Sequence, residues 1–262
     1  MISSTANPYV KRIRSLAADR RERRRERIVV LEGVRLLADA LASGAKIELA
    51  LYDTDQLAAS SAGQALLVQL APLTQAYPAT ARVVAAAADT MTPQGVVALA
   101  HWPEIAPGAP GIALVIDGVQ DPGNLGTLLR SAEAVGVMQV FCTSGTVDAY
   151  APKVVRAGMG AHFRLAIGQD LSWEQVGERL ANVDQIYAAD ASATLPYYAV
   201  DWRQRAALVI GSEAHGLSEA ARSYATRLVG IPMRGQAESL NAAVAGSILL
   251  FEALRQRSLG RS

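Results

Sequence analysis

The stretch that decides the fold is residues 112–130, which read IALVIDGVQDPGNLGTLLR. It begins with a run of five aliphatic residues, passes through a turn rich in Asp, Pro and Gly, and enters a helical pattern that we expect over 127–135. Such a short, continuous aliphatic run is typical of a parallel strand buried on both faces. Residues 208–210 (LVI) and 228–231 (LVGI) have the same character, and each precedes a polar cluster. Parallel sheets bind ligands beyond the carboxyl ends of their strands, so we expect the three clusters to converge.

Working outward, strands and helices alternate on both sides of a segment at 103–111 that holds three prolines and two glycines. Such a segment sustains neither helix nor strand and indicates a linker. We therefore predict two α/β domains, at residues 1–105 and 111–262. The length of 262 residues and the 51% hydrophobic content are enough for two cores. Within these domains, short strands are predicted over 82–84 and 163–167.

Positive charge is concentrated at the amino terminus. Residues 1–35 hold ten Lys and Arg against four Asp and Glu, a net +6, so the rest of the chain carries −5 and the total is +1. A basic block in a near-neutral protein indicates a polyanionic partner such as RNA or DNA. The alternative is that residues 20–27 form a solvated helix with internal ion pairs.

Several functional classes are disfavoured by what the sequence lacks. Cys142 is the single cysteine, which excludes an internal disulfide, and His101, His162 and His215 have no metal-ligand spacing, so we expect no metal. No apolar run approaches the roughly 20 residues that span a bilayer, and the polar amino terminus does not resemble a signal peptide. We expect no membrane association and a cytoplasmic location. The dinucleotide, Walker and nucleophile-elbow glycine patterns are missing, which argues against a dehydrogenase or hydrolase.

The first polar cluster, residues 121–130, is a turn entering a helix. Asn124 is suited to the helix start, and Arg130 lies further along the helix. A helix amino terminus with an arginine suits a phosphate or a hydroxyl beside one. The alternative is a capped helix in which Arg130 pairs with Glu133 or Asp121.

The second and third clusters leave similar alternatives. Gly211 lets the backbone approach a ligand closely, and Glu213 either organises Asn124 or Arg130 or caps a helix. His215 is interpreted as an incidental loop residue. Ser239 and Asn241 stand at the start of the last helix, where serine is usually a simple cap.

Taken together, the clusters carry a family resemblance. Residues 117–130, 211–218 (GSEAHGLS) and 231–241 (IPMRGQAESLN) match the three motifs of one class in order and spacing. Over residues 111–257 the chain resembles the SpoU/TrmH class of RNA ribose 2′-O-methyltransferases, in the SPOUT superfamily. More weakly, Glu32-Gly33 with Arg35, and residues 92–95 (TPQG), resemble the amino-terminal substrate-binding domain of its ribosomal-RNA branch.

The resemblance implies a carboxy-terminal SPOUT domain with an α/β trefoil knot and a smaller amino-terminal α/β RNA-binding domain. It implies methyl transfer from S-adenosyl-L-methionine to a ribose 2′-hydroxyl, with ribosomal RNA favoured as substrate, and a homodimer. A transfer-RNA 2′-O-methyltransferase and a non-catalytic RNA-binding protein of the same fold are the alternatives.

The resemblance also implies roles for particular residues. Asn124 and Arg130 would position the hydroxyl and its neighbouring phosphate, Glu213 would hold one of them, and Ser239 and Asn241 would complete the site. By the same correspondence, Gly211, Ile231 and Leu240 would surround the cofactor.

Overall fold

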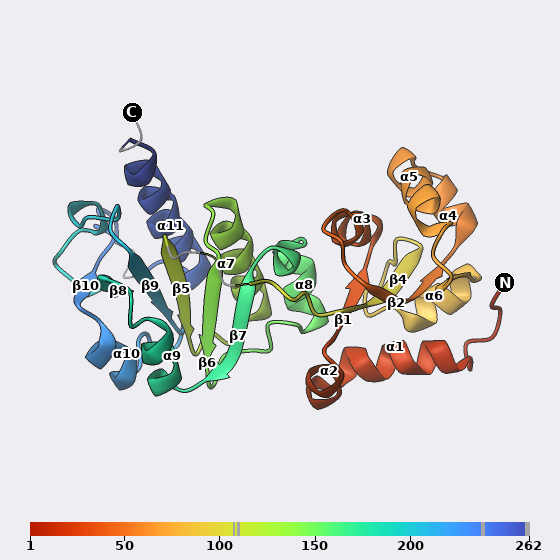
Figure 1. Cartoon of the computed structure of the whole chain (residues 1–262), viewed down its shortest axis with the longest axis horizontal. Helices are drawn as coiled ribbons and strands as arrows, with labels where there is room; N and C mark the ends of the chain where they lie inside the picture. Colours follow the sequence, from red (N-terminus) through yellow and green to blue (C-terminus); the bar gives the residue numbers. More distant parts are fainter. Residues whose placement is uncertain (107, 109–110, 237–238, 260–262) are drawn as a thin grey trace. The chain divides into compact units, whose positions relative to one another are not determined.

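The computed structural model describes residues 1–106, 108, 111–236 and 239–259 (Figure 1). They form two compact units. The first comprises Met1–Glu104 and Tyr150–Phe163, and the second Ile105–Ala149 and Arg164–Ser262. Pro107 and Pro110 of the predicted linker, and residues 237–238 of the third motif, lie outside the described residues. No helix in the described part of the chain combines the length and apolarity that a membrane span requires.

The first unit is built on a four-stranded sheet in the order β1-β4-β2-β3. Its strands are β1 (Ile28–Glu32), β2 (Ile47–Tyr52), β3 (Ala76–Pro78) and β4 (Val96–His101). Strands β1 and β2 run antiparallel to β4, and β3 runs parallel to β2. The helices that precede or connect these strands are α1 (Pro8–Ala18), α2 (Arg20–Glu26), α3 (Val34–Ala42), α4 (Thr54–Ala58), α5 (Ser61–Leu70) and α6 (Ala81–Ala87).

Helix α1 is part of the core of this unit. Val10, Ile13 and Leu16 recur at helical spacing, and all three side chains are buried in one cluster with residues of the sheet and of α6. The amino-terminal segment is therefore folded into the unit, and the exposed basic side chains Lys11 and Arg14 project from a helix whose other face is fixed.

The strand predicted over 82–84 is wrong, because these residues belong to α6. Val83 and Val84 are buried with Ala87, one turn further on, and their backbone N–H groups donate to the Thr80 carbonyl at 2.8 and 3.1 Å. Alanine has the highest helix propensity, so the alanine run that follows the two valines favours a helix over a strand of three residues. The strand predicted over 163–167 begins at Ala166.

The second unit is built on a six-stranded sheet in the order β10-β8-β9-β5-β6-β7, and every pair is parallel. The strands are β5 (Ile112–Asp117), β6 (Gln139–Thr143), β7 (Ala166–Leu171), β8 (Gln185–Ala189), β9 (Ala206–Gly211) and β10 (Arg227–Val229). The α-helices of this unit are α7 (Pro122–Ala134), α9 (Trp173–Arg179), α10 (Glu219–Tyr224) and α11 (Ala242–Leu259). The parallel strands inferred from the aliphatic runs are confirmed.

Helices cover both faces of this sheet (Figure 1). Alternate residues of the central strands, such as Val115 and Val209, are buried with α9 and α10. On the opposite face lie α7 and α11, which approach very closely at Gly246. A Cβ added there would lie 2.3 Å from Leu128 of α7 and 3.3 Å from Ile210 of β9. The start of α11 is thus held beside α7 and the end of β9.

The compact units differ from the predicted domains mainly in one segment, residues 150–163, which belongs to the first unit. Helix α8 (Pro152–Gly158) and the 3-10 turn Ala161–Phe163 lie between β6 and β7 in the chain, yet they belong to the first unit. Helix α8 packs on β1, and the Tyr150 ring stacks on Trp102 with centroids 3.9 Å apart. Arg156 pairs with Asp89 at 2.9 Å and with Glu32 at 3.5 Å. The alternation of strands and helices gives no sign of this exchange, because it does not show which core a crossover helix joins.

Candidate active site

Three of the five predicted catalytic residues meet in one hydrogen-bonded chain. The Asn124 side chain donates from Nδ2 to Glu213 Oε1 at 2.6 Å, and Asn241 Nδ2 donates to Asn124 Oδ1 at 2.9 Å. Asn124 lies in the first turn of α7, whose N-cap Asp121 accepts the Asn124 backbone N–H at 2.8 Å. Residues far apart in sequence therefore share a site at the carboxyl ends of the strands, as the strand-end rule predicts.

The start of α11 fixes which group donates and which accepts in each of these hydrogen bonds. Asn241 Oδ1 accepts the backbone N–H groups of Ala243 at 2.9 Å and Val244 at 3.2 Å, as a helix N-cap does. Because backbone N–H groups can only donate, the Asn241 amide nitrogen must point to Asn124 Oδ1, and the Asn124 nitrogen in turn to Glu213. Among the described residues Glu213 Oε2 has no hydrogen-bond partner, so this carboxylate oxygen is open to a ligand.

Glu213 is presented by a compact loop that follows β9. Ser212 and Gly216 exchange backbone hydrogen bonds at 2.9 and 3.0 Å, which closes the loop over Gly211. A Cβ on Gly211 would lie 2.4 Å from the carbonyl carbon and oxygen of Gly216, so this position requires glycine. The His215 side chain is exposed, and its backbone N–H donates to Ser212 Oγ at 3.1 Å, which agrees with its interpretation as a loop residue.

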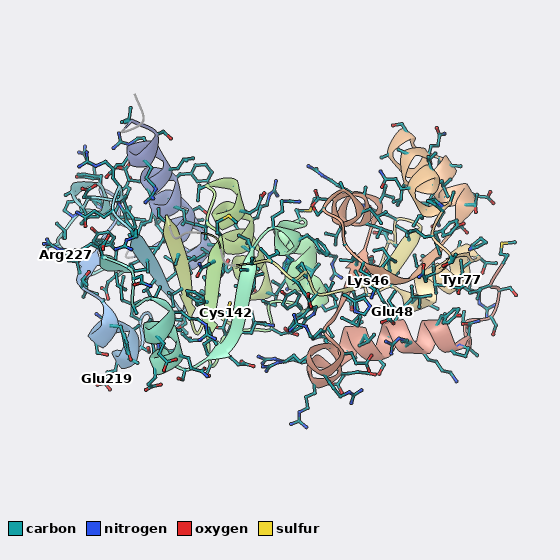
Figure 2. All side chains as sticks on the ribbon, in the orientation of Figure 1. Lys46, Glu48, Tyr77, Cys142, Glu219 and Arg227 are labelled. Atoms are coloured by element: carbon teal, nitrogen blue, oxygen red, sulfur yellow. The ribbon has the colours of Figure 1, made fainter. Side chains whose placement is uncertain are left out.

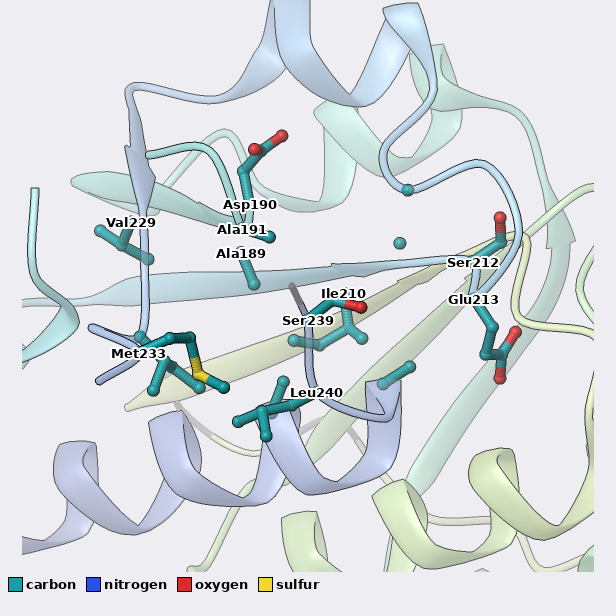
Figure 3. A pocket seen from close by; sticks show the side chains of 15 residues that line it. Ala189, Asp190, Ala191, Ile210, Ser212, Glu213, Val229, Met233, Ser239 and Leu240 are labelled. Carbon is teal, nitrogen blue, oxygen red and sulfur yellow. The ribbon is translucent and has the colours of Figure 1, made fainter. Parts of the chain in front are cut away.

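A cavity of about 280 Å³ opens beside this loop. It is lined by the ends of β8, β9 and β10 and by the segment leading to α11: Ala189, Asp190, Ala191, Ile210, Gly211, Ser212, Glu213, Gly216, Val229, Ile231, Met233, Ser239, Leu240, Ala242 and Ala245. Figure 3 shows Val229 and Met233 at one end, Ser212 and Glu213 at the other, and Ser239 and Leu240 beside α11. Gly211, Ile231 and Leu240, the residues expected around the cofactor, all line it.

The residues that line the cavity fit a nucleoside that carries a polar substituent. Its walls are mainly aliphatic side chains and backbone, with a few polar groups at the edges, which is typical of small-molecule sites. The closed turn over Gly211 brings backbone atoms where a side chain would otherwise stand. These features fit S-adenosylmethionine, and its binding residues stay a prediction.

Arg130 is not part of the hydrogen-bonded chain. It is exposed on α7 six residues after Asn124, which places it about 120° away around the helix. Neither expected partner is available: Glu133 pairs with Arg164 at 2.8 Å, and Asp121 caps the helix. Within the described part of the chain, Arg130 has no ion pair, which leaves its guanidinium available to an anion. Its catalytic role, like that of Ser239, stays a prediction.

Asp190 also lines the cavity, although it belongs to none of the three sequence motifs. It directly follows β8 and accepts hydrogen bonds from the Ser192 backbone N–H at 2.8 Å and from the Arg222 guanidinium. Burial raises its pKa, but the bonds from Ser192 and Arg222 outweigh this and lower the pKa overall. Its position at a strand end was the available signal, but a single aspartate without a motif does not stand out.

Cys142 is excluded as a nucleophile. It lies within β6 (Figure 2) and is buried, and burial raises the pKa of its thiol to about 12. The described residues contain no group of three His, Cys, Asp or Glu side chains arranged to hold a metal ion.

Comparisons with known proteins agree with this geometry. The sequence model of the SpoU rRNA Methylase family matches residues 111–251, and that of the MRM3-like substrate binding domain matches residues 7–98. The chain is 33% identical to the mitochondrial rRNA methyltransferase 3A of Danio rerio, over 94% of this chain and 68% of that protein. It is 32% identical to the 23S rRNA (guanosine(2553)-2′-O)-methyltransferase RlmP of Bacillus subtilis, over 95% and 97%.

Solved structures show the same relationship over nearly the whole chain. The SpoU methyltransferase AviRb from Streptomyces viridochromogenes, in complex with AdoMet, matches with a TM-score of 0.83 and 28% identity, covering 97% of this chain and 100% of that one. The expected α/β SPOUT fold, the expected class of S-adenosylmethionine-dependent RNA methyltransferase, and the expected cofactor are confirmed. On its motifs, its fold and its relatives, the chain belongs to the SpoU rRNA methylase family.

Proposed function

We propose that this protein transfers a methyl group from S-adenosylmethionine to a ribose 2′-hydroxyl of ribosomal RNA. The observation that carries the proposal is the chain Glu213–Asn124–Asn241, which ends beside the cavity at the carboxyl edge of the parallel sheet. The names of the relatives and the match to a substrate-binding domain favour ribosomal RNA over the transfer-RNA alternative.

The cofactor, when bound, supplies an electrophilic methyl group on its sulfonium. Gly211, Ile231 and Leu240 would hold it, mainly through backbone groups, because the side chains at these positions are absent or apolar. Glu213 and Ser239 line the same cavity and would face the polar portion of the bound molecule.

In this proposal, the residues of the chain orient the substrate hydroxyl and receive its proton. Glu213 Oε2 is an open acceptor at the end of a chain of fixed polarity, so it is suited to accept a hydrogen bond from the 2′-hydroxyl. Asn124 uses one Nδ2 hydrogen for Glu213 and has a second one for the hydroxyl oxygen. Once the methyl group has moved from the sulfonium to that oxygen, the proton on the oxygen is strongly acidic, and Glu213 Oε2 can take it. Arg130 would bind the adjacent phosphate, because a guanidinium does not give up its proton.

The basic amino-terminal helices would bind the RNA backbone, and the structure divides their cations into two groups. Arg23 is buried and donates to the carbonyls of Leu16 and Ala17 at 2.6 and 2.8 Å, while Arg12 lies between Glu26 and Glu48 at 2.8 and 2.7 Å. These two cations serve the fold. Lys11, Arg14 and Arg21 are exposed on α1 and α2. The exposed group is the one available to phosphates.

The expected homodimer would use the outer face of α11. Val244, Phe251 and Leu254 are 48%, 50% and 36% exposed, and their spacing of seven and three residues places them along one side of the helix. An apolar stripe on a helix that also carries the site is suited to a second copy of the chain. A ribosomal RNA substrate also agrees with the expected cytoplasmic location.

Mapping ribose methylation across total RNA, with and without the gene, tests the proposal. Loss of one or a few 2′-O-methyl groups in ribosomal RNA, restored by the wild-type gene and not by an Asn124→Ala variant, is the expected result. Loss confined to transfer RNA would favour the alternative substrate. No change in any RNA would refute the proposed reaction.

A further inference from the structure

Asp117, at the end of the central strand β5, is a buried carboxylate outside the proposed catalytic set. Its exposed fraction is 6%, and it accepts three hydrogen bonds from three different elements. Trp173 Nε1 and Thr143 Oγ1 donate to Oδ1 at 3.0 and 3.2 Å, and the Ser218 backbone N–H donates to Oδ2 at 2.7 Å. The two carboxylate oxygens therefore have separate partners among the described residues: Oδ1 bonds to α9 and β6, and Oδ2 bonds to the segment that follows β9.

The bond from Ser218 closes the base of the loop that carries Glu213. The loop begins at Gly211, which lies beside Asp117 in the register of the β5–β9 pair. It ends at Ser218, the N-cap of α10, whose backbone N–H returns to the same aspartate. Both ends of the loop are thus fixed at one residue, and the Ser212–Gly216 bonds fix its middle.

We propose that Asp117 is a positioning residue for methyl transfer, acting by holding the 211–218 loop so that Glu213 reaches Asn124. This inference rests on the proposed function, because it assigns Asp117 a role only through Glu213. A carboxylate suits the position because all three neighbours donate. An amide would direct N–H hydrogens at a donor in either orientation, whether at Ser218 or at Trp173. The Asp117→Asn variant would therefore lose the hydrogen bonds at one of the two side-chain oxygen positions, with almost no change in side-chain volume.

The sharpest test removes the donor instead of the acceptor. Ser218 has φ −65°, a value that proline adopts, so Ser218→Pro keeps the backbone angle, removes the N–H and places its Cδ where it must push the Asp117 carboxylate away. Ser218→Ala is the matched control, since it loses the same side-chain cap to Ala221 but keeps the N–H. Thr143→Val is the control for Asp117→Asn, because it removes a donor to Oδ1 and leaves the Ser218 bond intact.

With saturating cofactor, we expect kcat of Ser218→Pro to fall between about tenfold and 100-fold below that of Ser218→Ala, because a catalytic group displaced by 1 Å costs roughly 100-fold. The KM for RNA should not change. The dissociation constant of S-adenosylhomocysteine, measured by calorimetry, should change less than kcat does, because the β5–β9 pair still holds Gly211, although Ser212, Glu213 and Gly216 of the loop also line the cavity. In a Glu213→Ala background, the difference between the proline and alanine variants should vanish, which a merely structural role would not produce.

Equal kcat for Ser218→Pro and Ser218→Ala, or an undiminished difference in the Glu213→Ala background, would overturn the inference. If the proline variant does not fold, the same comparison is made with Asp117→Asn against Thr143→Val. Full activity of Glu213→Ala itself would instead refute the assigned role of Glu213 in the proposed function. The two failures are therefore distinguishable.

Discussion

Gly211 is the position where one methyl group should have the largest effect on the site. A Cβ there would lie 2.4 Å from the Gly216 carbonyl carbon and oxygen and 2.6 Å from the Leu217 nitrogen, whereas ordinary van der Waals contact begins at 3.4 Å. The obstacle is backbone, which cannot rotate away as a side chain does. The Gly211→Ala variant must therefore move the loop by about 1 Å, and a displacement of that size costs roughly 100-fold in rate.

The assay combines calorimetry with S-adenosylhomocysteine and single-turnover methyl transfer at saturating cofactor. Because Gly211 also lines the cavity, we expect weaker binding of the nucleoside together with the loss of rate. Gly235→Ala is the matched control, since a Cβ there meets nothing within 4 Å and its backbone is not in the left-handed region. A Gly211→Ala enzyme that folds, binds the nucleoside within twofold of wild type and keeps its rate would show that the closed turn does not shape the site.

Three further outcomes are expected. The Arg130→Ala variant should lose at least about 100-fold in methyl transfer and keep its affinity for S-adenosylhomocysteine, because Arg130 does not line the cavity; unchanged transfer would remove it from the mechanism. Replacing the exposed Lys11, Arg14 and Arg21 with glutamine should reduce the slope of log K for RNA against log salt by up to about 2, and an unchanged slope would exclude these cations from the RNA contact. Cys142, whose pKa is raised to about 12 by burial, should resist iodoacetamide at pH 8 until the protein is denatured, whereas labelling of the native protein would contradict its burial.

The second of these experiments replaces a simpler one that the sequence suggests, the removal of residues 1–27. In the structure that deletion would also remove Val10, Ile13 and Leu16 from the core of the first unit. A loss of RNA binding after such a deletion would report unfolding as readily as lost phosphate contacts. Substitution of exposed cations separates the two effects.

The second unit was largely predictable because its strands are buried on both faces. Continuous aliphatic runs such as 112–116 have no competing interpretation when glycine and a polar cluster follow, and parallel strands bring those clusters to one edge. The convergence of Asn124, Glu213 and Asn241 follows from that geometry. Local signals do not give the direction of each hydrogen bond, which depends on Asn241 capping α11.

The features that the sequence did not reveal have different physical causes. Val83 and Val84 favour a strand by propensity, but the alanines after them continue a helix whose buried side completes the core. Asp117 belongs to a recognised motif, yet its three donors lie 26, 56 and 101 residues away and only the folded chain brings them together. The ion-pair partners of Arg156 are likewise distant in sequence: Glu32 is 124 residues away and Asp89 is 67 residues away.

The excursion of residues 150–163 means that the polypeptide passes between the two units three times, after Glu104, after Ala149 and after Phe163. A fragment cut at the proline-rich segment would keep α8 but lose β1, the strand that covers it, and would expose Val154 and Val155 to water. Separate expression of the two halves should therefore yield poorly soluble fragments that aggregate. If the first unit were exchanged for another during evolution, α8 would likewise have to be exchanged, although it lies between β6 and β7 in the chain.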